Sequence, residues 1–302
     1  MPDYLPYEDR LPDSQYRNLL ERIMREGEDA EQTRQGVPAR TLFDLHMRFD
    51  LRNGFPVIPD RSLGPKKSWN KGIGELCGFM NGAQTVDELA DFGADWWHAW
   101  TDPDKCALFG FEPGVIGPAS YGPAMTAFPT LDGSLFDQIE NIVDQIIRLP
   151  HDRIHRIAIW MPKENSRLVH GYQKTTIAPC HGDVFIHILK GRIHLGMRQR
   201  SCDTPVGGPH NMAQYAALVL MLEHLTGFEA GVFYHSIWNA HIYADQFDNV
   251  EELLVREPRR LPTVRLGDAG LKATCLKDFR REHFELSDYD PHPAMNDIPV
   301  ST

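Results

Sequence analysis

The feature that most constrains the fold is a long apolar segment in the last third of the chain. From Tyr215 to Leu225 most residues are apolar, and the run is followed by Gly227, a residue type that commonly ends helices. A helix that is apolar on most of its surface is normally buried on all sides. We therefore predict a helix from about Asn211 to Gly227 that lies at the centre of the molecule.

The composition excludes several classes of protein. The chain has 302 residues, of which 42% are hydrophobic and 24% are charged, as in globular proteins that bury a sizeable core. The formal net charge of −11 and a pI near 5.7 disfavour nucleic-acid binding, which requires a basic face. No segment approaches the roughly 20 apolar residues that cross a bilayer, and the N-terminus has no apolar signal sequence. We expect a cytoplasmic protein that binds neither membranes nor nucleic acid.

The cysteines form no recognisable framework. They are odd in number and widely separated, and no C-x-x-C pair occurs. This pattern disfavours both a disulfide scaffold and a zinc knuckle, so each thiol has to be judged by its surroundings. The five are Cys77, Cys106, Cys180, Cys202 and Cys275.

The first half of the chain predicts two amphipathic helices. Residues 14–27 would bury Tyr16, Leu19, Leu20 and Ile23, and the polar residues 28–37 are expected to form a loop. Residues 47–57 predict a strand interrupted by the turn dipeptide Asn53-Gly54. A helix over residues 134–149 would begin at the cap Ser134, with Asp137 three residues later, and stop at Pro150. Its expected apolar stripe is Phe136, Ile139, Val143, Ile146 and Ile147.

Strands are predicted between the helix over residues 134–149 and the central helix. The segments are 154–160, 183–189 and 192–198. Helices and strands that mix without a regular βαβ rhythm indicate an α+β fold. Because no repeat or low-complexity linker occurs, we expect one main domain over residues 31–302, preceded by an N-terminal extension over residues 1–30 that contains a helix.

The last two predicted strands place a cysteine beside a guanidinium. Lys190-Gly191 is a plausible two-residue turn between them. That turn places Cys180 opposite Ser201, with Arg200 beside it. A nearby cation lowers a thiol pKa and raises the thiolate fraction. The hairpin alone leaves two hypotheses open, a nucleophile or an inert core cysteine.

Two further residue groups have alternative interpretations. Asn211 at a helix start could cap the helix, or its amide could bind the edge of a base, because it offers both a donor and an acceptor. A metal site is also conceivable, because strand alternation puts Asp183 and His187 on one face. Fourteen histidines produce such clusters by chance, so we predict no metal. The candidate metal ligands would be Cys180, His181, Asp183, His187 and His194.

Taken together, the motifs resemble the thymidylate synthase family in order and, from Cys180 to Asn211, in ungapped spacing. The resemblance covers roughly residues 30–300, and many separated motifs in one order are far more specific than any single match. It implies that residues 31–302 are the catalytic domain, with a large mixed β-sheet that forms the interface of a homodimer and is flanked by helices. The matching segments are 47–51, 54–56, 74–76, 121–122, 178–181, 199–203, Gly207, Pro209, Asn211, 241–243 and 289–293.

The resemblance also implies a reaction. A thiolate adds to C6 of a pyrimidine nucleoside 5′-monophosphate, and C5 then attacks the methylene carried by 5,10-methylenetetrahydrofolate, the cosubstrate. The implied catalytic residues are the nucleophile Cys180, Glu75 for water and proton movement, Tyr121 for proton removal from C5, Arg200 to polarise the thiol, and His181 near the C4 substituent.

The substrate and folate sites follow from the same resemblance. Two phosphate-binding arginines are supplied by the partner subunit in this family; an ungapped alignment at Trp160 matches Arg153 to one and Ile154 to the other. One arginine is therefore missing unless Arg156 replaces it. The remaining implied contacts are Arg34, Arg200 and Ser201 at the phosphate, Asn211 at the base, His241 and Tyr243 at the sugar, and Asp203, Trp97, Trp100 and His210 at the folate.

Three departures from the family pattern concern the folate side or the pocket wall. Tyr121-Gly122 is followed by residues 123–125 (Pro-Ala-Met) instead of glutamine-tryptophan-arginine, His210 replaces a phenylalanine that packs on folate, and residues 237–240 replace a glycine-rich segment. If water instead of hydride reaches the exocyclic methylene, the product is 5-hydroxymethyl. Relatives from phage and antibiotic pathways hydroxymethylate dUMP, dCMP or CMP in this way. We predict hydroxymethylation, with reductive methylation of dUMP to dTMP as the alternative.

The base and the catalytic status are separate questions. Asn211 fits the N3–H and O4 of uracil, and the phage cytosine enzymes have an aspartate at this position, so we favour dUMP over dCMP or CMP. A non-catalytic nucleotide-binding protein is the alternative from another class. It is disfavoured because Cys180, Glu75, Tyr121 and Arg200 occur together.

Overall fold

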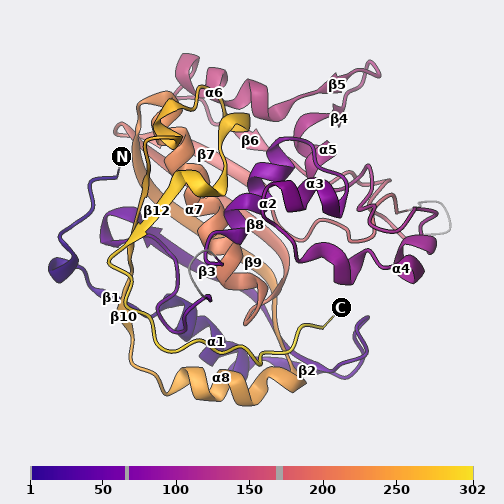
Figure 1. Cartoon of the computed structure of the whole chain (residues 1–302), viewed down its shortest axis with the longest axis vertical. Helices are drawn as coiled ribbons and strands as arrows, with labels where there is room; N and C mark the ends of the chain where they lie inside the picture. Colours follow the sequence, from indigo (N-terminus) through magenta and orange to yellow (C-terminus); the bar gives the residue numbers. More distant parts are fainter. Residues whose placement is uncertain (1, 65–67, 168–172, 302) are drawn as a thin grey trace.

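A computed structural model describes residues 2–64, 68–167 and 173–301 of the chain. The largest sheet in these residues has six strands in the order β2-β3-β9-β8-β7-β6 (Figure 1). β8 and β9 are parallel, whereas the other neighbours are antiparallel. The predicted α+β class with a large mixed sheet is therefore confirmed. The strands are β2 (Glu28–Ala30), β3 (Ala39–Asp50), β6 (Arg156–Ile157), β7 (Asp183–Leu189), β8 (Arg192–Asp203) and β9 (Glu229–Tyr243).

The predicted central helix is α7 (Gly207–Thr226), which connects β8 to β9. Every residue from Asn211 to Glu223 is buried, so its apolar surface is covered on all sides. Gly227 ends the helix in the left-handed conformation with φ +77°. The helix begins earlier than expected, which places Asn211 inside it. Of the two interpretations of Asn211, the one in which it caps the helix is therefore wrong.

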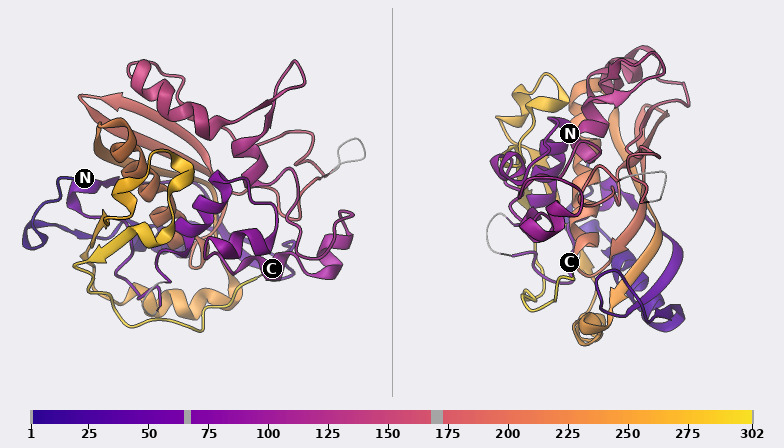
Figure 2. Two further views of the ribbon diagram at one scale, coloured as in Figure 1. Left: turned by 45° about the horizontal axis from the view of Figure 1, so that its top comes forward. Right: turned by 90° about the vertical axis from the view of Figure 1, so that its right-hand side faces the viewer.

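The remaining helices lie mainly on one face of the sheet (Figure 2). α2 contacts α7 so closely that a Cβ atom on Gly72 would lie 2.8 Å from the carbonyl oxygen of His210. Glycine at this position therefore permits the two helices to approach each other. The helices are α1 (Gln15–Glu26), α2 (Lys71–Met80), α3 (Val86–Asp91), α4 (Pro103–Ala107), α5 (Tyr121–Thr126), α6 (Gln138–Arg148) and α8 (Phe247–Leu254).

Three two-stranded sheets complete the structure within the described residues. The pairing of β1 with β10 joins the segment before α1 to the C-terminal part of the chain, and β11 and β12 form an antiparallel pair. β4 pairs with β5 just before α6. Their bounds are β1 (Pro12–Asp13), β4 (Phe128–Pro129), β5 (Leu135–Phe136), β10 (Arg259–Arg260), β11 (Thr263–Leu266) and β12 (Phe284–Ser287).

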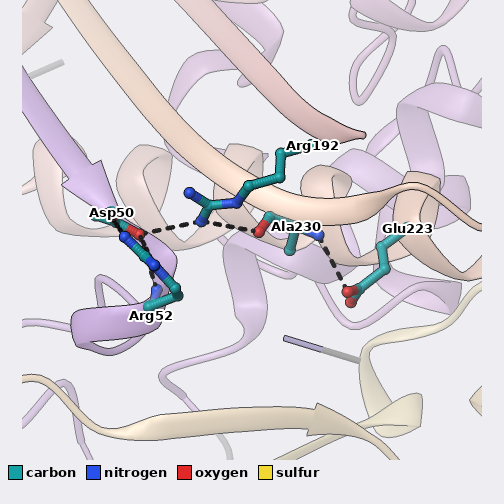
Figure 3. A network of polar contacts seen from close by, with 5 residues as sticks. All are labelled: Asp50, Arg52, Arg192, Glu223 and Ala230. Carbon is teal, nitrogen blue, oxygen red and sulfur yellow. Dashed lines mark hydrogen bonds and ion pairs between the residues drawn. The ribbon is translucent and has the colours of Figure 1, made fainter. Parts of the chain in front are cut away.

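A network of charged side chains connects one end of the sheet to the end of α7 (Figure 3). Arg192 Nη2 donates to Asp50 Oδ1 and to the carbonyl oxygen of Ala230, both at 3.3 Å. Asp50 also accepts from Arg52, and the Ala230 N–H donates to Glu223 Oε1 at 3.0 Å. The network therefore fixes the end of β3 and the beginnings of β8 and β9.

Several local predictions need correction. α1 and its four buried residues are as predicted, but residues 28–30 form β2 instead of a loop, and β3 begins at Ala39. Asp137, not Ser134, caps α6, because residues 135–136 pair in β5. Phe136 therefore precedes the helix and is exposed. Ile147 is also exposed, whereas Ile142, which was not in the predicted stripe, is buried. The strand predicted over 154–160 is reduced to the short β6, whereas β7 matches its prediction.

No helix in the parts of the chain that the structure describes is long and apolar enough to cross a membrane.

Candidate active site

The site residues meet where β8 and β9 end and β7 begins. Lys190 and Gly191 both have positive φ angles, 53° and 75°, and form the predicted turn between β7 and β8. Beyond the regular ladder, the Arg200 N–H donates to the carbonyl oxygen of Cys180 at 2.6 Å, and the Ser201 N–H lies 3.4 Å from it. The predicted hairpin geometry is thus confirmed.

The Cys180 thiol lies between a cation and a phenol. Arg200 Nη2 is 3.5 Å from Cys180 Sγ, and it also donates to the carbonyl oxygen of Ala178 at 3.2 Å. The Arg200 guanidinium lies over the Trp160 ring, 5.6 Å from its centroid. The Cys180 N–H donates to Tyr121 Oη at 2.7 Å. These contacts fix the sulfur next to a permanent positive charge.

Burial raises the pKa of the Cys180 thiol, while the charge of Arg200, a hydrogen bond with Tyr121 and the charge of Arg34 oppose this effect.

Because a raised pKa keeps the Cys180 thiol mostly protonated near neutrality, the rate of its alkylation by iodoacetamide should rise about tenfold per pH unit between about pH 7 and 9. Arg200→Ala should slow it, because the opposing cation is lost. Peptide mass spectrometry measures the rate, with the exposed Cys275 as internal comparison; a plateau below about pH 8 would contradict this account.

A cluster of aromatic rings packs beside Cys180. Tyr121 is 2% exposed and stacks on Phe79 with ring centroids 4.4 Å apart. His181 lies against Tyr121 at 4.7 Å, and its Nδ1 is 2.8 Å from Tyr215 Oη. Burial lowers the pKa of His181 to about 3, so its imidazole is neutral. A neutral imidazole can donate or accept a hydrogen bond without adding charge.

Glu75, in the middle of α2, accepts three hydrogen bonds although it is buried. Trp96 Nε1 and Trp97 Nε1 both donate to Oε1 at 2.7 Å, and Gln214 Nε2 donates to Oε2 at 3.2 Å. Burial raises the pKa of Glu75 against the effect of these donors. A raised pKa allows a carboxyl group to hold a proton at a higher pH than an exposed one, which suits a group that acts in general acid–base catalysis.

The chain of hydrogen bonds continues from Gln214 to Asn211 and Gln199. Asn211 Nδ2 donates to Gln214 Oε1 and Asn211 Oδ1 accepts from Gln199 Nε2, both at 3.0 Å. Gln199 Oε1 is 2.7 Å from His235 Nε2. Asn211 is therefore connected to Glu75 through a single side chain.

The predicted phosphate-binding arginines have different environments. Arg34 is largely exposed. Partial loss of solvent around its guanidinium has the largest effect on its pKa and lowers it. The positive charge of Arg167 also lowers the pKa of Arg34, whereas the Cys180 thiol raises it. Arg156 is paired with Asp183 by two hydrogen bonds of 3.0 and 3.2 Å. Arg153 is exposed in the segment before β6. Only Arg34 and Arg200 of the predicted set therefore interact with the thiol.

The predicted sugar and pterin residues lie at the ends of β8 and β9. Asp203 is opposite His241 in the ladder, and His241 Nδ1 is 2.8 Å from Asn239 Oδ1. Tyr243 is the last residue of β9, and Ser201 is opposite Asn239. Asp203 accepts two hydrogen bonds of 3.2 Å from Gln246, and burial raises its pKa to about 7. Trp238, a member of the altered segment, lies instead on the outer sheet face beside Phe43.

The folate wall, which we define as Trp97, Trp100 and His210 with the neighbouring Trp96, has more polar atoms around it than the sequence suggested. Trp96 lies 4.8 Å from the His210 ring, and Trp100 lies 6.1 Å from Trp97. Burial and the charges of Arg61 and Lys71 lower the pKa of His210 to about 3. Within the described ranges, three buried atoms near the first turn of α7 have no hydrogen-bond partner: Arg61 Nε, Asn70 Oδ1 and His210 Nδ1. Buried polar atoms normally have partners, so these atoms fit a bound polar heterocycle or water.

No group of three or more histidine, cysteine, aspartate or glutamate side chains within the described segments is arranged to hold a metal ion. His187 and His194 are directly opposite each other on β7 and β8. The alternative metal-site hypothesis therefore gains no support from these residues.

The sequence model of one protein family, thymidylate synthase, matches residues 14–301. The chain belongs to the thymidylate synthase family. This family transfers a one-carbon unit from 5,10-methylenetetrahydrofolate to a pyrimidine nucleotide. The protein is accordingly a one-carbon transferase of nucleotide biosynthesis, and its substrates are a pyrimidine nucleotide and a folate.

The sequence reasoning did not identify several side chains that contact these predicted residues, among them Trp96, Gln214 and Arg167. Trp96 donates to Glu75 and contacts His210, Gln214 joins Glu75 to Asn211, and Arg167 lies near Arg34. The Trp96-Trp97 pair is a local signal that could have identified Trp96. Gln214 could be identified only by the packing of α7 on α2, because nothing in its sequence neighbourhood distinguishes it.

Proposed function

We propose that this enzyme hydroxymethylates dUMP at C5. The observation that carries the proposal is His210: a neutral imidazole with a buried, unpartnered Nδ1 in the folate wall, in contact with Trp96, which in turn donates to Glu75. A polar atom at this position can hold a water molecule, whereas an apolar ring would exclude it. Water beside the exocyclic methylene favours the hydroxymethyl product.

The covalent steps are assigned to the residues around Cys180. Its thiolate forms a bond to C6 of the pyrimidine, and the electron pair released at C5 attacks the methylene carbon that the folate supplies. Tyr121 assists removal of the C5 proton, the bond between the methylene carbon and the folate nitrogen breaks, and tetrahydrofolate leaves. Water then adds to the exocyclic methylene that remains on C5. The sulfur–carbon bond finally breaks, which releases 5-hydroxymethyl-dUMP and regenerates the thiolate. Arg200, 3.5 Å from Sγ, stabilises the thiolate before attack.

Binding roles follow the same geometry. Arg34, Arg200 and Ser201 are proposed to hold the phosphate, Asn211 the base, and His241 and Tyr243 the sugar hydroxyl. Asp203, Trp97, Trp100 and His210 are proposed for the folate. The three unpartnered buried atoms near α7 support this assignment, because a pterin offers donors and acceptors of its own.

Reductive methylation of dUMP is the second candidate, and His210→Phe distinguishes the two. Phenylalanine at position 210 removes the polar atom and restores an apolar wall, so the ratio of hydroxymethyl to methyl product should fall at least about tenfold. Mass spectrometry of the nucleotide products measures this ratio. If the wild type already yields mainly dTMP and dihydrofolate, the role assigned to His210 is wrong.

A homodimer is proposed from the outer face of the sheet. Exposed aromatic rings gather there, including Trp238 and Phe43, which are 60% and 52% exposed. Such a patch on a sheet face normally marks an interface. A partner subunit on this face would supply Arg153 and Arg156 to the opposite active site.

The cytoplasm remains the proposed location, in keeping with the free thiols of the described residues.

The test of the proposed function is covalent trapping. A 5-fluoropyrimidine nucleotide cannot lose its C5 substituent as a proton, so 5-fluoro-dUMP and methylenetetrahydrofolate should leave a stable adduct on Cys180. Intact-protein and peptide mass spectrometry identify the adduct and its position. An enzyme that forms no adduct with 5-fluoro-dUMP, 5-fluoro-dCMP or 5-fluoro-CMP would not carry out this reaction.

A further inference from the structure

Asn211 is held between two buried glutamines. Its Oδ1 accepts from Gln199 Nε2 and its Nδ2 donates to Gln214 Oε1, each at 3.0 Å. Gln214 is completely buried, and Gln199 and Asn211 are only 3% and 6% exposed. A buried amide with a fixed partner on each side cannot reverse without leaving polar atoms unpaired. The orientation of the Asn211 amide is therefore set by its neighbours.

The direction of this chain of hydrogen bonds follows from Glu75. Gln214 Nε2 donates to Glu75 Oε2, 3.2 Å away, which leaves the Gln214 oxygen to accept from Asn211. The ionised form of Glu75 requires this orientation, because a carboxylate only accepts hydrogen bonds. On the other side, His235 Nε2 lies 2.7 Å from Gln199 Oε1, so Gln199 turns its NH₂ group towards Asn211. Reversal of Asn211 would bring oxygen against oxygen and NH₂ against NH₂.

A fixed amide distinguishes the two pyrimidine bases. Uracil presents N3–H as a donor and O4 as an acceptor, whereas cytosine presents N3 as an acceptor and its 4-amino group as a donor. The same edge thus requires the opposite order of donor and acceptor from Asn211. An amide that can turn accommodates either base, but a fixed amide matches one base and opposes the other.

We propose that Gln214, held by Glu75, is a positioning residue that fixes the Asn211 amide and so selects uracil over cytosine. This inference rests on the proposed function, in which Asn211 binds the pyrimidine. It assigns base selection to a side chain that belongs to α7 and does not itself touch the nucleotide. The same contact connects the base-binding amide to the carboxylate that is proposed to move protons.

The test compares Gln214→Met with Gln214→Glu. Methionine fills a similar volume without polar atoms, so the ratio of kcat/KM for dUMP to that for dCMP should fall at least about tenfold. Glutamate still accepts from Asn211 Nδ2 but repels Glu75, so the ratio should stay close to that of the wild type while kcat falls. Gln138→Met is the matched control, because Gln138 is a buried glutamine on α6 that binds the carbonyl oxygens of Ala124 and Ala158. It should leave the ratio unchanged.

An unchanged ratio in folded Gln214→Met, in an enzyme that still forms the 5-fluoro-dUMP adduct, would overturn the inference and leave the proposed function intact. If Gln214→Met does not fold, Gln199→Met tests the same claim from the other side of Asn211, and again the ratio should fall at least about tenfold. A wild type that forms no adduct with any 5-fluoropyrimidine nucleotide would overturn the proposed function and this inference together.

Discussion

Cys180→Ala should abolish turnover, with a loss of at least about 10⁴-fold in kcat, and should eliminate the 5-fluoro-dUMP adduct. The reason is chemical: without the sulfur, no bond forms to C6, and C5 has no electron pair with which to attack the methylene carbon. Nucleotide binding should change little, because Arg200 remains attached to the carbonyl oxygens of Ala178 and Pro179. Turnover is measured by product mass spectrometry and binding by calorimetry.

Cys275→Ala is the matched control, since Cys275 is an exposed free thiol outside the site. It should retain wild-type turnover and the full adduct. Residual product formation by Cys180→Ala at more than about one hundredth of the wild-type rate would show that Cys180 is not the nucleophile.

Glu75→Gln should lower kcat by about 10²- to 10⁴-fold, the usual contribution of a general acid–base group. The neutral amide cannot cycle a proton, and it also disturbs the hydrogen bonds. Glu75 accepts from Trp96 and Trp97 on one oxygen and from Gln214 on the other, so the NH₂ group of a glutamine faces a donor in either orientation. We expect a loss of about 1–3 kcal/mol in the free energy of unfolding, measured by denaturant titration alongside kcat.

The control for this substitution is Glu223→Gln. Glu223 is a buried glutamate near the end of α7, where it accepts a hydrogen bond from the Ala230 N–H. Glu223→Gln should affect stability but leave kcat unchanged. If Glu75→Gln also changed only stability, the buried carboxylate would have a structural function and no part in proton transfer.

The elements that depend on local sequence could be predicted. α7 was recognisable because its apolar residues cover every side, and the β7–β8 hairpin because Lys190-Gly191 tolerates the positive φ angles of its turn. Residues 28–30 and 135–136 could not be recognised as strands, because two or three residues are too few to show an alternating pattern and their pairing with β3 and β4 is visible only in the fold. That pairing, which has no local pattern, also explains why Ser134 was wrongly predicted to cap α6.

The same distinction applies to the site. The contact between Cys180 and Arg200 follows from strand register and could be derived from the hairpin alone. The contact between Gln214 and Glu75 depends on how α7 packs against α2, and the one between Trp96 and His210 depends on a loop that lies against α7. Such contacts between distant segments leave no periodic signal in the sequence.

The most direct test of the central claim is to incubate the protein with methylenetetrahydrofolate and dUMP, dCMP or CMP in parallel and to identify the nucleotide products by mass spectrometry. We expect 5-hydroxymethyl-dUMP from dUMP and little product from the two cytosine nucleotides. A methyl product together with dihydrofolate would contradict the role assigned to the polar folate wall. No product from any of the three nucleotides would contradict one-carbon transfer by Cys180 altogether.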